Sequence, residues 1–114
     1  MTADCLFCKF ATGDIGVPKL HEDNLVYAMR DINPQAPTHI LLIPVAHVVS
    51  AADLGEADAA MLGRIASVAA SLAKADGLDG GWRLVTNVGA DAGQSVRHLH
   101  YHLLGGRSMT WPPG

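Results

Sequence analysis

Three histidines at alternate positions near the C-terminal end constrain this chain more than any other feature. The segment 92–106 reads Ala-Gly-Gln-Ser-Val-Arg-His-Leu-His-Tyr-His-Leu-Leu-Gly-Gly, and its histidines are His98, His100 and His102. On a β-strand alternate side chains leave the same face, so this spacing predicts a row of three imidazoles. The opposite face then carries three largely apolar side chains, Leu99, Tyr101 and Leu103. The sequence therefore predicts a strand with one polar, reactive face and one face packed on a core.

Two interpretations of the imidazole row remain open at this point. A glycine-containing turn with Ser95 precedes the histidines, so the imidazoles would lie beside free backbone amides and a hydroxyl, which suits a phosphate-bearing substrate. Metal binding competes with this interpretation, because imidazole is the commonest metal ligand in proteins. A chance arrangement is disfavoured, because half of the six histidines of the chain fall in this one row.

Length and composition limit the class of protein. A chain of 114 residues predicts a single domain over residues 1–114 with one core. With 49% hydrophobic and 17% charged residues it is not a disordered chain, and a net charge of −3 argues against a nucleic-acid partner. We expect no signal peptide and no membrane partner, because no basic start and no apolar run of about 18 residues is present. The sequence thus predicts a soluble, cytoplasmic protein.

The apolar pattern predicts an α+β fold with a largely antiparallel sheet of about five strands. A short N-terminal helix is indicated over 5–10, and a long helix with apolar positions from Leu54 to Leu72 is expected to end at Gly77. Strands are expected over 20–22, 25–30, 39–44 and 82–88, with the histidine strand following. The segment 39–44 is apolar without alternation, which predicts a central strand covered on both faces.

Four segments resemble the histidine triad (HIT) nucleotide hydrolases and transferases. The runs Gly93-Gln94-Ser95-Val96 and His98-Leu99-His100-Tyr101-His102-Leu103-Leu104 resemble the family signature. The runs 31–39, Asp-Ile-Asn-Pro-Gln-Ala-Pro-Thr-His, and 109–114, Met-Thr-Trp-Pro-Pro-Gly, resemble its Hint branch in particular. The resemblance covers essentially the whole chain. It implies a HIT-like fold, with one long helix and a short N-terminal helix per chain.

The resemblance also implies a reaction and its catalytic residues. A Hint-like enzyme is a purine nucleoside phosphoramidase that cleaves a P–N bond and releases AMP or GMP. His100 would be the nucleophile and form a nucleotidyl-histidine intermediate, while His102 would contact the phosphate oxygens. His39 would lie beside the nucleophile on the leaving-group side, and Ser95 would donate to the leaving atom. Without the resemblance, His39 would be interpreted as a residue at a strand end.

A nucleotide site is implied by the same resemblance. Asp31 would accept the ribose hydroxyls, although an aspartate at a strand end is also common as the first residue of a turn. Asn87 is either a turn residue or part of the site, and Gly93 would let the backbone approach phosphate closely. The implied nucleotide-binding residues are Leu6, Phe7, Phe10, Ile15, Met29, Asp31, Ile32, Asn87, Gly93, Ser95, His100 and His102.

The pair Cys5-x-x-Cys8 allows a metal half-site, a redox dithiol or two core thiols by its spacing alone. A redox pair is expected between a strand and the helix that follows it, yet no strand precedes Cys5, and a disulfide is disfavoured in a reducing cytoplasm. Resemblance to bacterial members of the family implies zinc bound by this pair with His47 and His98. Four protein ligands would leave no position for water, so the zinc would be structural.

Other functions and the assembly stay open. Alternatives to the phosphoramidase are a hydrolase of dinucleoside polyphosphates or acyl adenylates, and a nucleotide-binding regulatory module. The Hint resemblance implies a homodimer in which the terminal segment with Trp111 reaches the partner's cleft. The alternative is a frayed terminus, which is the usual state of the last residues of a chain.

Overall fold

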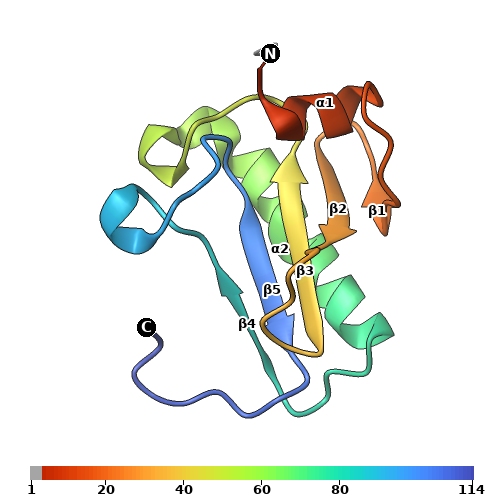
Figure 1. Ribbon diagram of the computed structural model, residues 1–114, viewed down its shortest axis with the longest axis vertical. Helices are drawn as coiled ribbons and strands as arrows, with labels where there is room; N and C mark the ends of the chain where they lie inside the picture. Colours follow the sequence, from red (N-terminus) through yellow and green to blue (C-terminus); the bar gives the residue numbers. More distant parts are fainter. Residues whose placement is uncertain (1–3) are drawn as a thin grey trace.

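A computed structural model describes residues 4–114. Residues 1–3, part of the N-terminal segment in which no signal peptide is expected, lie outside the described residues. A five-stranded antiparallel sheet has the order β1-β2-β3-β5-β4 (Figure 1). The elements are α1 (Leu6–Thr12), β1 (His21–Glu22), β2 (Val26–Arg30), β3 (Thr38–Pro44), α2 (Ala59–Ala75), β4 (Trp82–Val85) and β5 (Tyr101–Gly105). Short 3-10 turns lie at Ala51–Asp53, Glu56–Asp58 and Ala90–Ala92. The predicted α+β fold is confirmed.

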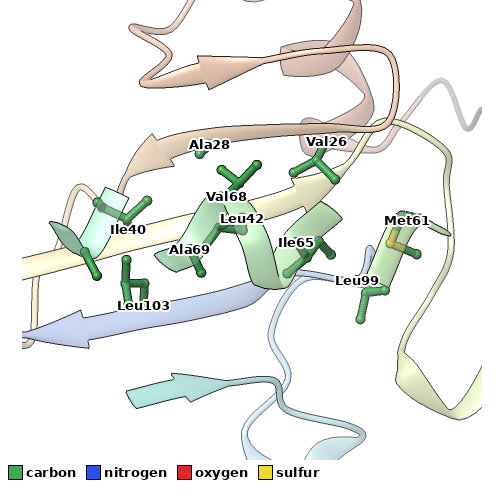
Figure 2. Close-up of a cluster of buried hydrophobic side chains, with 11 residues drawn as sticks. Val26, Ala28, Ile40, Leu42, Met61, Ile65, Val68, Ala69, Leu99 and Leu103 are labelled. Atoms are coloured by element: carbon green, nitrogen blue, oxygen red, sulfur yellow. The ribbon is translucent and has the colours of Figure 1, made fainter. Parts of the chain in front are cut away.

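The central strand β3 is buried along its whole length, as its uninterrupted apolar sequence predicts. On one face Ile40 and Leu42 pack with Ile65 and Val68 of α2 (Figure 2), which lies behind the sheet in the view of Figure 1. On the other face its side chains join a second cluster, which consists of Phe7, Phe10, Tyr27, Met29, Leu41 and Ile43. Because α2 packs on one face of β2, β3 and β5, a binding site over these central strands has room on the face next to α1.

The apolar face predicted opposite the histidines packs on α2. Leu99 and Leu103 are 1% and 0% exposed and belong to the α2 cluster, and Tyr101 packs against it. Truncating a buried leucine of this kind to alanine typically costs about 2–5 kcal/mol. The burial of this face therefore directs the alternate side chains, the histidines, away from α2.

The histidine strand is shorter than predicted, because it begins only at Tyr101. Before it, the amide of Leu99 donates to the carbonyl of Val48 at 2.6 Å instead of to a neighbouring strand. Likewise the strand expected over 82–88 ends at Val85, and the Thr86 hydroxyl donates to the carbonyl of His100 at 2.8 Å. Side-chain and loop contacts thus replace the sheet pairing of residues 98–100.

The long helix also begins later than predicted. Leu54 packs against the α2 cluster but precedes the helix, which starts at Ala59. Gly55 is extended, and its amide donates to the Asp58 carboxylate at 2.9 Å, so the chain turns before the helix begins. The predicted end at Gly77 is confirmed. This glycine has φ 71°, and the amide of Leu78 donates to the Ala73 carbonyl at 3.0 Å.

An aspartate at the end of α2 ties the helix to the sheet. Arg30 of β2 donates two hydrogen bonds of 3.0 Å to Asp76, and the Thr38 hydroxyl of β3 donates a third at 2.8 Å. These bonds hold the end of β2 next to the start of β3, where Asp31 and His39 lie. Among residues 4–114, no helix is both long and apolar enough to span a membrane.

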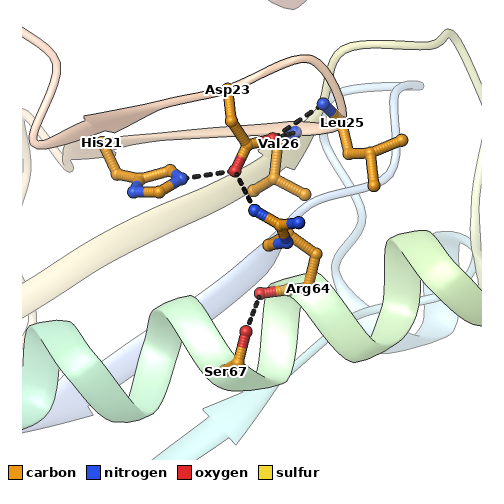
Figure 3. Close-up of polar contacts among 6 residues, drawn as sticks. All are labelled: His21, Asp23, Leu25, Val26, Arg64 and Ser67. Carbon is orange, nitrogen blue, oxygen red and sulfur yellow. Dashed lines mark hydrogen bonds and ion pairs between the residues drawn. The ribbon is translucent and has the colours of Figure 1, made fainter.

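A second aspartate, Asp23, joins the β1–β2 turn to α2 (Figure 3). Its carboxylate accepts hydrogen bonds from His21 at 2.5 Å and from Arg64 at 3.2 Å, and two more from the amides of Leu25 and Val26. Burial opposes the charged form, but the bonds from His21 and the two amides, with the charge of Arg64, outweigh it and lower the pKa of Asp23.

Replacing Asp23 with alanine should lower the free energy of unfolding by about 1–3 kcal/mol at pH 7, because four donors lose their acceptor. A lowered folded-state pKa means that this contribution is complete above the ordinary value of 3.8 and is lost as the pH falls below it. Urea unfolding of both proteins at pH 7 and pH 3 checks this. The matched control is Asp79→Ala in the exposed loop after α2. A stability difference for Asp23→Ala that is as large at pH 3 as at pH 7 would contradict the assignment.

Candidate active site

A cavity of about 350 Å³ lies on the sheet face next to α1. Its walls come from α1, from the end of β2 with the two residues that follow, from β3, and from the segment around the histidines. The lining residues are Leu6, Phe7, Phe10, Met29, Arg30, Asp31, Ile32, Leu41, Ser95, Val96, His100 and His102. A larger hollow of about 550 Å³, between residues 77–83 and 106–109, has no described His, Cys, Asp or Glu in its lining.

The ring of His100 is held in one tautomer by its own segment. Its Nδ1 lies 2.8 Å from the carbonyl oxygen of His98, which can only accept a hydrogen bond. The ring proton is therefore on Nδ1, and Nε2 keeps a free lone pair. The Phe7 ring contacts the imidazole edge-on, with 5.1 Å between ring centroids. His100 thus presents an oriented ring nitrogen with a lone pair at the cavity wall.

His39 and His102 form a second ordered pair. The amide of Gln35 donates to His39 Nδ1 at 3.0 Å, so the proton of this ring is on Nε2 and donates to His102 Nδ1 at 2.8 Å. The proton of His102 is then on Nε2, which is buried and has no hydrogen-bond partner among the described residues. An unpaired buried donor is costly, so this N–H beside His100 is suited to meet an oxyanion.

Burial keeps both of these rings neutral at physiological pH. Desolvation lowers the pKa of His39, although the nearby Asp31 carboxylate opposes the shift. Desolvation, together with the neighbouring His100 and His39, lowers the pKa of His102 to about 4, and the Asp31 carboxylate again opposes this shift. The Asp31 carboxylate lies 3.4 Å from His39 Nε2, so a negative charge borders the pair.

Next to the cavity, four side chains direct sulfur and nitrogen atoms toward one point. They are Cys5, Cys8, His47 and His98, and their donor atoms lie within 4.8 Å of one another. Cys5 Sγ and Cys8 Sγ lie 3.2 Å and 3.6 Å from His98 Nδ1. Cys8 Sγ lies 3.4 Å from His47 Nδ1, which lies 3.2 Å from His98 Nδ1.

These distances fit a tetrahedral zinc ion. Zinc bonds of about 2.3 Å to sulfur and 2.0–2.1 Å to nitrogen place ligand atoms at about 3.4 Å (nitrogen to nitrogen) and about 3.6 Å (nitrogen to sulfur). The tautomer of His98 fits as well, because its Nε2 donates to the Pro44 carbonyl at 2.8 Å and leaves Nδ1 free to ligate. The donor set therefore suits zinc.

Asp31, His39 and His102 also bring three possible ligand atoms together. The proton on His39 Nε2, however, occupies the position that a metal ion would need. His39 Nδ1 already accepts from the Gln35 amide, so Nε2 carries the proton and has no lone pair for a cation. The Asp31–His39–His102 group is consequently a chain of hydrogen bonds, whereas in the cysteine cluster His98 Nδ1 keeps a lone pair for a metal.

Most sequence-predicted site residues line the cavity, and a few lie outside it. Ile15, Asn87 and Gly93 are not in the lining, and Ile15 is 40% exposed. His39 is not in the lining either but is hydrogen-bonded to His102, which is. Trp111 lies in the terminal segment and is 85% exposed. The cavity also includes three residues that sequence reasoning missed, Arg30, Leu41 and Val96. Leu41 could have been found from the strand alternation that separates it from Ile40 and Leu42.

Gln94 is a further residue whose role the sequence did not reveal. Its side-chain oxygen accepts from the Gly89 amide at 2.9 Å. Its nitrogen donates to the carbonyls of Val49 and Val96 at 2.7 Å and 3.1 Å. Gln94 therefore braces the loop that presents Ser95 at the cavity.

Comparisons with known proteins give matches over most of the chain. A family model described as the HIT domain matches residues 14–109. A 14 kDa zinc-binding protein from Zea mays is 47% identical over 96% of this chain and 87% of its own. The crystal structure of a HIT family hydrolase from Legionella pneumophila has a TM-score of 0.94 at 51% identity, covering 97% of this chain and 100% of its own. A HIT family hydrolase from Clostridium thermocellum has a TM-score of 0.92 at 41% identity, covering 96% of both chains.

The purified protein should carry about one zinc ion per chain, because the four donor atoms match the spacing of a tetrahedral zinc site. His47→Asn should lose most of this zinc, whereas His21→Asn, which removes a histidine outside the cluster, should keep it. Metal analysis after desalting and thiol titration measure both. A metal-free native preparation in which both cysteines titrate freely would rule out the zinc site.

Proposed function

The chain belongs to the HIT domain family, and on that premise we propose that it hydrolyses the P–N bond of purine nucleoside 5′-phosphoramidates. Two similar structures are named HIT family hydrolases, which supports hydrolysis as the reaction class. The observation that carries the proposal is the hydrogen bond from His100 Nδ1 to the His98 carbonyl, because it leaves Nε2 unprotonated at the cavity.

In the proposed first step His100 Nε2 attacks the α-phosphorus and the P–N bond breaks. The bonding electron pair goes to the amine nitrogen, which takes up the proton of the Ser95 hydroxyl and leaves, and the water that attacks in the second step returns a proton to Ser95. The Nε2–H of His102 donates to a phosphate oxygen as negative charge develops there. Water then attacks the nucleotidyl-histidine and releases AMP or GMP. Two smaller barriers replace one large one.

The rest of the cavity supports a nucleotide. Asp31 lies at its edge with a carboxylate that suits the two ribose hydroxyls. Leu6, Phe7 and Phe10 form an apolar wall for the base, and Ile32 is 95% exposed at the mouth, where it can cover the base. Because few polar groups face the base, we expect weak discrimination between adenine and guanine.

Zinc in the cysteine cluster would have a structural role. Its four ligands leave no open position for water, so the ion would contribute folding free energy rather than activate a nucleophile. The maize relative named as a zinc-binding protein supports the choice of metal.

We also propose a homodimer in which the terminal segment of each chain docks on its partner. Within residues 4–114, β4 is an edge strand with one unpaired side, and an exposed edge is an energetic and aggregation liability. In Figure 1 the C-terminal segment runs away from the sheet, and Trp111 is 85% exposed. A second copy would cover both features.

His100→Ala should lower kcat by about 10³-fold or more while AMP still binds, because the imidazole is used to form a bond and contributes little to ground-state affinity. Hydrolysis of adenosine 5′-phosphoramidate and calorimetric titration with AMP measure the two effects. His21→Ala, on a histidine remote from the cavity, should turn over like the unmodified protein.

Two outcomes would contradict this proposal. Near-normal kcat in His100→Gly would exclude the covalent intermediate. Comparing kcat/KM for the phosphoramidate, a diadenosine polyphosphate and an aminoacyl adenylate tests the substrate class. Faster hydrolysis of either competing substrate would overturn the phosphoramidate assignment, and no hydrolysis of all three would favour a regulatory nucleotide-binding module.

Deleting residues 108–114 should preserve the dimer, because sheet and helix contacts would hold it, but should change the preference among leaving amines. Trp111→Ala should reproduce the change if the ring is the docking group. Equilibrium sedimentation and kcat/KM for several amines measure these effects. A monomeric intact protein, or identical kinetics for every amine, would argue against the docked tail.

A further inference from the structure

The short helix α1 contributes to both sites of the molecule. Cys5 caps the helix, with Sγ accepting from the Cys8 amide at 3.4 Å, and both sulfurs belong to the metal cluster. Three other residues of the same helix, Leu6, Phe7 and Phe10, line the cavity. Any movement of α1 that accompanies loss of a metal ion therefore also moves one wall of the cavity.

A helix of seven residues is not stable by itself, so α1 depends on its external contacts. One is the buried Tyr27 hydroxyl of β2, which donates to the Phe7 carbonyl at 2.6 Å. Others are the burial of Phe7 and Phe10 against β2 and β3. Cys5 and Cys8 supply a further attachment through their contacts with His47 and His98, and a bound cation would strengthen it by joining the four side chains.

His98 connects the two sites a second time, through its main chain. Its ring is fully buried between the Pro44 carbonyl and the metal cluster, so the cluster orients this residue. Its carbonyl oxygen holds the Nδ1 proton of His100. The orientation of a metal ligand thus sets the tautomer of the residue assigned as nucleophile.

Phe7 provides the third connection. Its ring contacts His98 edge-on, with centroids 5.9 Å apart, and His100 edge-on at 5.1 Å. The side chain is 5% exposed, so it has little space to move independently of these two rings. Phe10 also lines the cavity and stacks on Phe7, but has no ring contact with either histidine among the described residues.

We propose that metal occupancy of the Cys5–Cys8–His47–His98 cluster controls the nucleotide affinity of the cavity, with Phe7 as the positioning residue that couples the two sites. This inference rests on the proposed nucleotide-binding function. Coupling between two binding sites is reciprocal, so a bound nucleotide must hold the metal more tightly by the same factor. The protein would then bind nucleotide well only when divalent zinc is available.

Two measurements without catalytic turnover test the coupling. Calorimetric titration with AMP should show at least about fivefold weaker binding to chelator-treated protein than to the zinc-loaded protein, provided that circular dichroism shows both folded. The fraction of zinc released at equilibrium to a chromogenic chelator should fall at saturating AMP, by an amount that corresponds to the same factor in zinc affinity. This second measurement starts from the zinc-loaded protein, so it decides the question even if the metal-free chain unfolds. Inorganic phosphate at the same concentration controls for zinc complexation by AMP in solution.

A matched pair of variants tests the role of Phe7. At AMP concentrations that saturate each variant, zinc release in Phe7→Leu should no longer respond to AMP, whereas Phe10→Leu, which alters the same wall but touches neither His98 nor His100, should keep the response. Zinc release that is unaffected by AMP in the unmodified protein, or equal AMP affinity with and without zinc in folded protein, would overturn the coupling. Failure of AMP to bind the zinc-loaded protein at all would instead overturn the proposed nucleotide function.

Discussion

The two sites depend on hydrogen bonds between imidazole rings and main-chain groups. A neutral imidazole has one proton for two nitrogens, so the partner of one nitrogen decides what the other can do. The Pro44 carbonyl holds the proton of His98 at Nε2 and frees Nδ1 as a ligand, while the His98 carbonyl holds the proton of His100 at Nδ1 and frees Nε2. The Gln35 amide instead donates to His39 Nδ1, which leaves the proton of His39 on Nε2 and makes Nε2 a hydrogen-bond donor. Main-chain groups do not titrate at physiological pH, so these assignments are stable.

The sheet supplies the rigid frame on which these bonds are possible. β3 is buried on both faces and pairs with β2 and β5, which places His39 beside the histidine segment and Pro44 beside the metal cluster. The end of β5 and the turn after it leave no room for side chains. A Cβ on Gly105 would lie 2.6 Å from the Leu78 side chain, and a Cβ on Gly106 would lie 2.8 Å from Pro37. Glycine at these positions lets the chain pass close to the loops at that end of the sheet.

Much of the fold was predictable from local pattern. The uninterrupted apolar run of β3, the helical spacing before Leu72 and the end signal at Gly77 each reflect short-range rules, and the structure confirms them. The limits of β4, β5 and α2 were predicted less well. At the limits of β4 and β5 a group outside the strand makes the hydrogen bond: the Val48 carbonyl accepts from the Leu99 amide, and the Thr86 hydroxyl donates to the His100 carbonyl. Such partners are distant in sequence, so periodicity does not reveal them.

The sequence by itself determined which residue types are present and how they alternate, and therefore that the histidines oppose an apolar face at the end of an α+β sheet. Only the tertiary structure decided which nitrogen of each imidazole carries the proton, because the deciding groups lie as far as 54 residues away along the chain. It also decided that Phe7 touches both His98 and His100. The physical reason is that side-chain direction follows from local backbone geometry, whereas a ring's partner depends on how distant segments pack.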